Sequence, residues 1–238
     1  IEEEGPREEF QIESETISTA DKIRLIEALS ETGLSRIDCV SFVNPRKVPG
    51  MADSDEVMRQ IRRRAGVRYT GLWLNTRGLQ RAFEVASDVI GSIRIATSNT
   101  FSIRNTGMDL VETAAEQAKW LEIYRDRRVE MGWGYVMTAF GCNYEGPTEI
   151  PAVLGAVELL NALAHDAGVS LRGIYLADTV GTATPLAIER AVGAVRSRWP
   201  ELPIGLHLHD TRGTGLANAY AALRLGVAQF DSACGGLG

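Results

Sequence analysis

Two neighbouring segments decide the fold: RGIYLADTVGT at residues 172–182 and PIGLHLHDTRGT at residues 203–214. Each starts with a short apolar run and continues into the pattern Asp-Thr-x-Gly-Thr. Short apolar runs bounded by turn-forming residues are typical of buried parallel strands, and successive βα units produce such an echo. The echo itself has two interpretations, Asx-type turns at strand-to-helix junctions or a pair of functional loops.

The same alternation extends outward from these segments along the whole chain, in strand and helix pairs of about 25 to 35 residues. Ser18 and Thr184-Pro185 are typical helix starts, and Gly33 is a typical helix end. With no low-complexity linker, we expect residues 1–238 to form one domain, an α/β (β/α)8 TIM barrel. Eight strands with seven intervening helices are expected, the strands near residues 2–7, 36–42, 67–74, 92–97, 131–139, 172–177, 203–209 and 228–233.

Composition excludes several classes of protein. The chain of 238 residues has a net charge of −6, which argues against a general nucleic-acid binder. No apolar run approaches the roughly 18–20 residues that cross a bilayer, and the three widely spaced cysteines indicate a reduced, intracellular protein. We therefore expect a cytoplasmic protein. The chain begins within a predicted strand and stops in a glycine-rich turn, so an incomplete barrel after the eighth strand and an organellar targeting peptide both stay open.

The active site of such a barrel lies at the carboxyl ends of its strands, where His207 and His209 stand at the end of the seventh. Residues i and i+2 of a strand point to the same side, so both imidazoles should face the barrel axis while Leu206 and Leu208 face the helices. Two neighbouring imidazoles are good ligands for a divalent metal. His165 lies in a helical pattern and is interpreted as an exposed residue near a helix C-terminus.

The first predicted strand ends at Arg7 and Glu8. The first and seventh strands of a barrel flank the eighth, so Glu8 can reach a metal held by the two histidines. A set of two histidines and one carboxylate suits oxygen-dependent iron chemistry as well as Lewis-acid catalysis with Mg²⁺ or Mn²⁺, and the ligand types do not decide between them. The other glutamates near this end, at positions 2–4 and 9, are interpreted as mostly solvated surface charge.

Taken together, these motifs resemble the 3-hydroxy-3-methylglutaryl-CoA lyase family of metal-dependent (β/α)8-barrel lyases and synthases. The resemblance covers nearly the whole chain, and residues 231–238 are similar to the family's glycine-rich approach to its catalytic loop. Five motifs in the same order carry it: GPREEFQ (5–11), SFVNPRKVPGMAD (41–53), FGCNYEG (140–146), DTVG (178–181) and HLHDTRG (207–213).

The resemblance implies a carbon–carbon lyase that cleaves a 3-hydroxy-3-methylglutaryl thioester, or a related 3-hydroxyacyl-CoA, into acetyl-CoA and a keto acid by retro-Claisen chemistry. It implies that Glu8, His207 and His209 bind Mg²⁺ or Mn²⁺, and that the cation makes the substrate hydroxyl more acidic. Arg7 would stabilise negative charge on the thioester oxygen, and His207 would also relay a proton.

Further residues take candidate roles from the same resemblance. Asp38 and Asp178 would orient a ligand or assist proton transfer. The candidates for substrate binding, besides Arg7, are Gln11, Ser41, Thr179 and Cys142.

Three positions depart from the family's pattern. Glu8 stands where the family usually has aspartate, and Asp38 stands where it usually has glutamate. Glu9 replaces a glycine. The paired change suggests a site reshaped for a different acyl group, because one methylene moves a carboxylate by roughly 1 Å and catalysis is sensitive to such displacements. The family's catalytic cysteine and a metal-binding asparagine fall beyond Gly238, and Cys234 is interpreted as structural.

Two alternatives remain at this point. One is an aldolase or a Claisen-type synthase of the isopropylmalate or homocitrate type that acts on 2-oxoacids. The other is a non-catalytic barrel that only binds. As partners we expect an acyl-CoA or small keto-acid substrate and a second copy in a homodimer, with no nucleic acid and no membrane.

Overall fold

The computed structural model of the protein describes residues 1–13, 17–85 and 87–236. Within these ranges eight strands alternate with nine α-helices, and neighbouring strands pair in parallel. The predicted (β/α)8 class is therefore confirmed. The number of helices exceeds the predicted seven because two helices follow β1 and two follow β4. The chain forms two compact units, Ile1–Val89 with Asp231–Gly238 and Ile90–Phe230.

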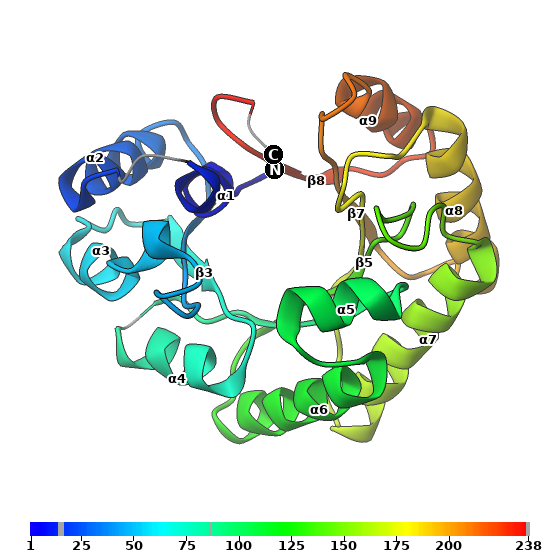
Figure 1. Ribbon diagram of the computed structural model, residues 1–238, viewed down its shortest axis with the longest axis horizontal. Coiled ribbons are helices and arrows are strands. Elements are labelled where there is room, and N and C mark those ends of the chain that lie inside the picture. Colours follow the sequence, from blue (N-terminus) through cyan, green and yellow to red (C-terminus); the bar gives the residue numbers. More distant parts are fainter. Residues whose placement is uncertain (14–16, 86, 237–238) are drawn as a thin grey trace. The chain divides into compact units, whose positions relative to one another are not determined.

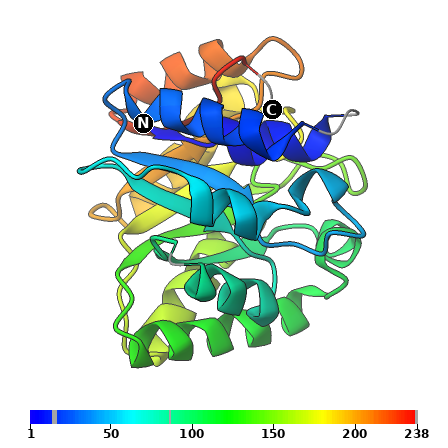
Figure 2. The same ribbon diagram turned by 90° about the vertical axis from the view of Figure 1, so that its left-hand side faces the viewer.

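The first unit holds four parallel strands in the order β3-β2-β1-β8, and β2 and β3 can be followed side by side in Figure 2. Its helices α2 to α4 follow the blue-to-cyan part of the chain in Figure 1. The strands are β1 (Glu2–Glu3), β2 (Arg36–Ser41), β3 (Arg68–Leu72) and the end of β8 (Gln229–Ser232). The helices are α1 (Gly5–Ile12), α2 (Thr19–Ser30), the 3-10 turn η1 (Pro49–Met51), α3 (Ser54–Gln60) and α4 (Thr76–Glu84).

The first strand is much shorter than the predicted 2–7, which is a correction to the sequence-based boundary. It ends at Glu3, and α1 begins at Gly5 with Pro6 in its first turn. Proline is favoured there because its fixed φ suits a helix start and its missing N–H would lack a helical partner anyway. Arg7 and Glu8 therefore lie on the first turns of a helix instead of at a strand end.

A buried lysine fixes the loop that follows β2. The Lys22 ammonium lies 2.6 Å from the Asp53 carboxylate and donates a hydrogen bond of 2.6 Å to the Gly50 carbonyl oxygen. Because an unpaired buried ammonium is costly, this pairing holds α2 against the segment between η1 and α3. The predicted start of α2 is confirmed, since the Ser18 hydroxyl accepts a hydrogen bond from the Asp21 amide.

The second unit holds five parallel strands in the order β4-β5-β6-β7-β8, and α6 and α7 pack against β4 and β5. The strands are β4 (Gly91–Ala96), β5 (Met131–Met137), β6 (Gly173–Ala177), β7 (Ile204–His207) and the start of β8. The helices are α5 (Asn99–Thr106), α6 (Leu110–Asp126), α7 (Ile150–Asp166), α8 (Pro185–Arg198) and α9 (Gly215–Arg224).

Strand β7 also ends earlier than predicted, at His207, so His209 lies just beyond it. Leu206 is fully buried, as expected for a side chain that faces the helices, whereas Leu208 is only partly buried. Exposed His165 lies in the last turn of α7, as predicted. Among the described residues, no helix combines the length and the apolar character needed to span a membrane.

Candidate active site

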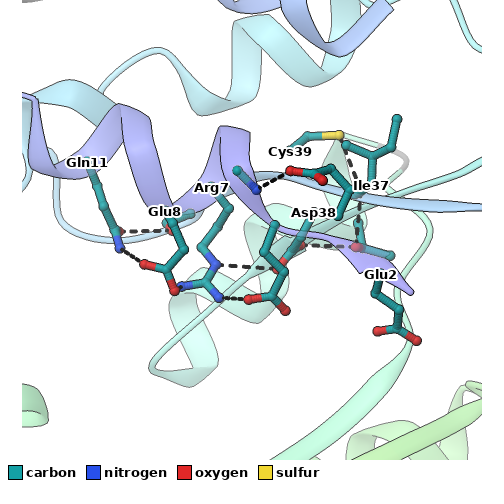
Figure 3. A network of polar contacts seen from close by, with 12 residues as sticks. Glu2, Arg7, Glu8, Gln11, Ile37, Asp38 and Cys39 are labelled. Carbon is teal, nitrogen blue, oxygen red and sulfur yellow. Dashed lines mark hydrogen bonds and ion pairs between the residues drawn. The ribbon is translucent and has the colours of Figure 1, made fainter. Parts of the chain in front are cut away.

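Arg7 is the centre of a buried ionic cluster in the first unit (Figure 3). Its guanidinium forms ion pairs with Glu4 and Glu8, and its Nε atom lies 3.5 Å from an oxygen of Asp38. These contacts tie the first turns of α1 to β2. Burial alone would lower the pKa of Arg7, but Glu4, Glu8, Asp38 and Asp231 raise it above its ordinary value. The guanidinium is thus a fixed cation in a water-poor setting.

Asp38 is a buried carboxyl group of the same cluster. It lies in β2 and accepts a hydrogen bond of 3.0 Å from the Thr70 hydroxyl. Burial and the negative charge of Glu4 raise the pKa of Asp38 to about 6, although Arg7, Arg36 and the Thr70 hydrogen bond act in the opposite direction. A carboxyl group with such a pKa can both accept and donate a proton under physiological conditions.

Replacing Asp38 with asparagine should change how stability depends on pH. The folded protein holds the Asp38 proton more tightly than the unfolded chain does, because its pKa rises to about 6 from 3.8. This contribution is complete below about pH 4 and is lost as the pH rises through about 6. We therefore expect the free energy of unfolding of Asp38→Asn, relative to the wild type, to increase between about pH 4 and 7.

Urea unfolding of both proteins across this pH range measures the difference. Asp166→Asn is the matched control, because the Asp166 side chain is exposed at the end of α7. Wild-type and Asp38→Asn stabilities that stay parallel over the range would contradict the prediction.

Two further predicted residues, Gln11 and Ser41, connect to Glu8 through a chain of hydrogen bonds. The Gln11 amide donates to the Glu8 carboxylate at 3.5 Å, and the Ser41 hydroxyl donates to the Gln11 amide oxygen at 3.3 Å. Ser41 is fully buried at the end of β2. The structure therefore gathers Arg7, Glu8, Gln11, Asp38 and Ser41 in one network of the first unit, most of which Figure 3 labels.

One member of this network, Glu4, was missed by the sequence analysis. Glu2, Glu3 and Glu4 are all buried, so their interpretation as surface charge was wrong. The reason is that β1 lies between β2 and β8, where each carboxylate finds a partner. Glu2 lies 2.5 Å from Arg36, and Glu3 accepts hydrogen bonds of 2.8 Å from the amides of Gly5 and Cys234.

In the second unit, His207 and His209 converge as predicted. Their Nε2 atoms lie 3.2 Å apart, with ring centroids 5.0 Å apart. Neighbouring ligands of an octahedral cation with bonds of about 2.1 Å are separated by roughly 3 Å, so the pair fits two adjacent positions on one divalent metal. Imidazole nitrogens also suit such a cation chemically.

Asp178 shows the turn chemistry predicted for the Asp-Thr-x-Gly-Thr pattern, and its second carboxylate oxygen is not used by the turn. One carboxylate oxygen accepts hydrogen bonds from the Thr182 amide at 2.8 Å and the Ala183 amide at 3.0 Å, which is turn chemistry. The other oxygen is buried, and the described residues offer it no hydrogen bond. Burial raises the pKa of Asp178, against those amides and the charges of His209 and Arg212. Asp210 forms a similar turn with the Gly215 amide, at 2.6 Å, but is exposed.

The remaining predicted residues lie at the ends of β5 and β6. The Thr179 hydroxyl accepts a hydrogen bond of 2.8 Å from the Thr138 amide. Cys142 is buried, with its sulfur 3.2 Å from the Ser98 hydroxyl. Burial would raise the pKa of Cys142, but its hydrogen bond with the Ser98 hydroxyl and those from the amides of Glu145 and Tyr144 lower it overall. At Cys234, close to Gly238, burial and the charges of Glu3 and Glu9 raise the pKa of the thiol to about 11.

Comparison with known proteins places the chain in a family. The HMGL-like family model matches residues 1–238. A hydroxymethylglutaryl-CoA lyase of Bacillus subtilis is 37% identical over 238 residues, which is 100% of this chain and 77% of that protein. A 3-hydroxy-3-isohexenylglutaryl-CoA/hydroxymethylglutaryl-CoA lyase of Pseudomonas aeruginosa is 37% identical over 99% of this chain and 76% of its own.

A solved structure supports the same assignment. It is an HMG-CoA lyase of Acinetobacter baumannii in complex with coenzyme A and 3-methylmalate, with a TM-score of 0.88 and 36% identity over 100% of this chain and 75% of that chain. The chain described here therefore belongs to the HMGL-like family and is a carbon–carbon lyase.

Proposed function

We propose that the protein cleaves 3-hydroxy-3-methylglutaryl-CoA, or a closely related 3-hydroxyacyl-CoA, to acetyl-CoA and a keto acid. The observation that carries this proposal is the 37% identity to hydroxymethylglutaryl-CoA lyases along the full chain. The coenzyme A and 3-methylmalate bound to the similar Acinetobacter structure support a substrate that combines a CoA thioester with a small carboxylic acid. No observation favours a synthase acting on 2-oxoacids or a barrel that only binds.

The site must remove one proton, assist the cleavage of one carbon–carbon bond and stabilise the negative charge that results. The 3-hydroxyl group must lose its proton as the C2–C3 bond breaks, so that C3 becomes the ketone carbon and C2 keeps the electron pair as a thioester enolate. Protonation of C2 then yields acetyl-CoA. The costly step leaves negative charge on the thioester oxygen, and a preorganised cation beside that oxygen lowers its energy.

The roles proposed for the individual residues come from the family resemblance, and the charges and contacts of these residues support them. Arg7 would stabilise the thioester oxygen, since its carboxylate partners fix its guanidinium in place. Asp38, with a pKa of about 6, would exchange protons or orient a ligand. Asp178 has a second buried oxygen available for the same tasks. Gln11, Ser41, Thr179 and Cys142 are proposed to contact or border the substrate.

We propose Mg²⁺ or Mn²⁺ as the cofactor, held by His207, His209 and Glu8. The 3.2 Å separation of the two Nε2 atoms supports the histidine part of this set. The Glu8 assignment rests on its place in the GPREEFQ motif. When bound, such a cation supplies Lewis acidity that makes a coordinated hydroxyl easier to deprotonate.

Three broader expectations also remain proposals: one catalytic domain, a cytoplasmic location and a homodimer. The similar proteins differ in location, since a mouse relative is named cytoplasmic and a chicken relative mitochondrial.

The experiment that tests the function is acetyl-CoA release from 3-hydroxy-3-methylglutaryl-CoA by the purified protein, with Mg²⁺ or Mn²⁺ and with a chelator. We expect release that depends on the metal. A thermal-shift series with CoA thioesters and with free 2-oxoacids separates the lyase from a synthase, because ligands stabilise the folded state that binds them. A folded, metal-loaded protein that releases no acetyl-CoA would reject this substrate.

A further inference from the structure

Thr138 has a backbone conformation that its side chain disfavours. It follows the last residue of β5 and has φ +56°. Among the described residues other than glycine, Arg128 alone shares a positive φ. A β-branched residue rarely adopts this left-handed region, and such strained residues tend to cluster at functional sites, where their surroundings hold them. Thr138 is fully buried at the end of a parallel strand, which is the end where barrels of this class carry their active sites.

A network of hydroxyl groups holds Thr138 in this conformation. The Thr97 hydroxyl, after β4, donates to the Thr138 carbonyl oxygen at 2.7 Å and lies 2.9 Å from the Thr138 hydroxyl. The Thr148 hydroxyl donates to the same carbonyl oxygen, also at 2.7 Å. The Thr97 amide donates to the Thr138 hydroxyl at 3.2 Å. The end of β4 thus contacts the Thr138 backbone directly, and the Thr138 hydroxyl adds a second link, because it accepts from the Thr97 amide and donates to the Met137 carbonyl oxygen at 2.6 Å.

The backbone of Thr138 also contacts a predicted substrate residue. The Thr138 N–H donates to the Thr179 hydroxyl oxygen at 2.8 Å, joining the end of β5 to the loop after β6. A threonine hydroxyl has one hydrogen and two acceptor positions. With one acceptor position occupied by this N–H, the Thr179 hydrogen is oriented away from Thr138. Thr179 is half-buried, so its hydroxyl can present that hydrogen to a bound molecule.

We propose that Thr138 is a positioning residue, which fixes the Thr179 hydroxyl as a hydrogen-bond donor to an anionic oxygen of the acyl-CoA substrate. The inference rests on the proposed lyase function and names a determinant within that site. Glycine would adopt φ +56° without strain but would lack the hydroxyl that joins Thr138 to Thr97. The hydrogen bond between the Thr138 hydroxyl and the Thr97 amide thus explains why threonine occupies this strained position.

A double-mutant cycle on kcat/KM tests the proposal. Thr138→Val keeps the shape and removes the hydroxyl, Thr138→Ser keeps the hydroxyl, and Thr179→Val removes the proposed donor. We expect Thr138→Val and Thr179→Val each to lower kcat/KM for 3-hydroxy-3-methylglutaryl-CoA by about tenfold, since small displacements of positioned groups have such effects. Thr138→Ser should restore activity to within about threefold of the wild type.

The double variant distinguishes positioning from a general structural role. If Thr138 acts through Thr179, Thr138→Val has no further effect once Thr179→Val is present, and the double variant equals Thr179→Val alone. A merely structural role would lower activity equally in both backgrounds, giving about a hundredfold loss. That additive result would overturn the proposal, as would a Thr138→Val variant with wild-type kcat/KM.

Further controls keep the outcomes separate. Thermal unfolding of each variant shows whether it is folded, and Thr106→Val, in the last turn of α5, is the matched control that should leave kcat/KM unchanged. If Thr138→Val does not fold, Thr148→Val takes its place in the cycle. It removes one hydrogen bond to the Thr138 carbonyl oxygen, and the same pattern of kcat/KM values is expected. A folded, metal-loaded wild type without lyase activity overturns the proposed function and this inference together, whereas an active wild type with an additive cycle overturns only the inference.

Discussion

His207→Ala should lower kcat/KM for acetyl-CoA release by at least about 10³-fold and should remove most of the bound divalent metal, because a Lewis-acid cation supplies several kcal/mol of transition-state stabilisation. The physical basis is the pair of Nε2 atoms 3.2 Å apart at the end of β7. Losing one of two adjacent nitrogen ligands leaves His209 as the only imidazole of the set.

Metal content after dialysis and steady-state kinetics in added Mg²⁺ or Mn²⁺ measure the two effects together. His165→Ala is the matched control, since the His165 side chain is exposed in the last turn of α7. It should keep both metal and activity. A His207→Ala protein that binds metal as the wild type does and stays active would contradict the assignment of this residue.

Arg7→Lys should lower kcat by about 10² to 10³-fold, with a smaller change in KM, because removing a preorganised partner of a developing oxyanion has effects of that size. Lysine keeps the positive charge, so Glu4, Glu8 and Asp38 do not become a buried cluster without a cation. Its single ammonium cannot match the planar guanidinium that contacts all three carboxylates.

Steady-state kinetics across the same metal concentrations measure this loss, and urea unfolding shows whether the variant is folded. Arg24→Lys serves as the matched control, because the Arg24 side chain is exposed on α2. Equal kcat values for wild type and Arg7→Lys would show that a point charge is sufficient and that the guanidinium geometry has no role.

Local periodicity was sufficient to predict the order of strands and helices. Seven of the eight predicted strands overlap the observed ones closely, because short apolar runs between helical patterns are a local signal. The exception is β1, where the predicted strand 2–7 ends already at Glu3 and a helix with Pro6 in its first turn follows. The strand-like spacing of His207 and His209 likewise predicted that they share one side, although β7 ends at His207.

The buried acids could not be predicted in the same way. Glu4 and Asp38 have ordinary surface-type side chains, and only the pairing of β1 with β2 and β8 places them around Arg7. The pKa of Asp38 is raised to about 6 by burial and by Glu4, neither of which is a property of the local sequence. Thr138 is similar, because nothing in its neighbours along the chain indicates φ +56°.

Local patterns along the chain were enough to predict the (β/α)8 class, the family and most candidate residues, because these depend on single strands and motifs. The folded chain was needed to see which charges are buried, which hydroxyl groups hydrogen-bond to which backbone atoms, and that Arg7 lies on a helix. Those properties arise from hydrogen bonds and ion pairs between segments far apart in the chain, such as Arg7 with Asp38 and Thr138 with Thr97 and Thr179.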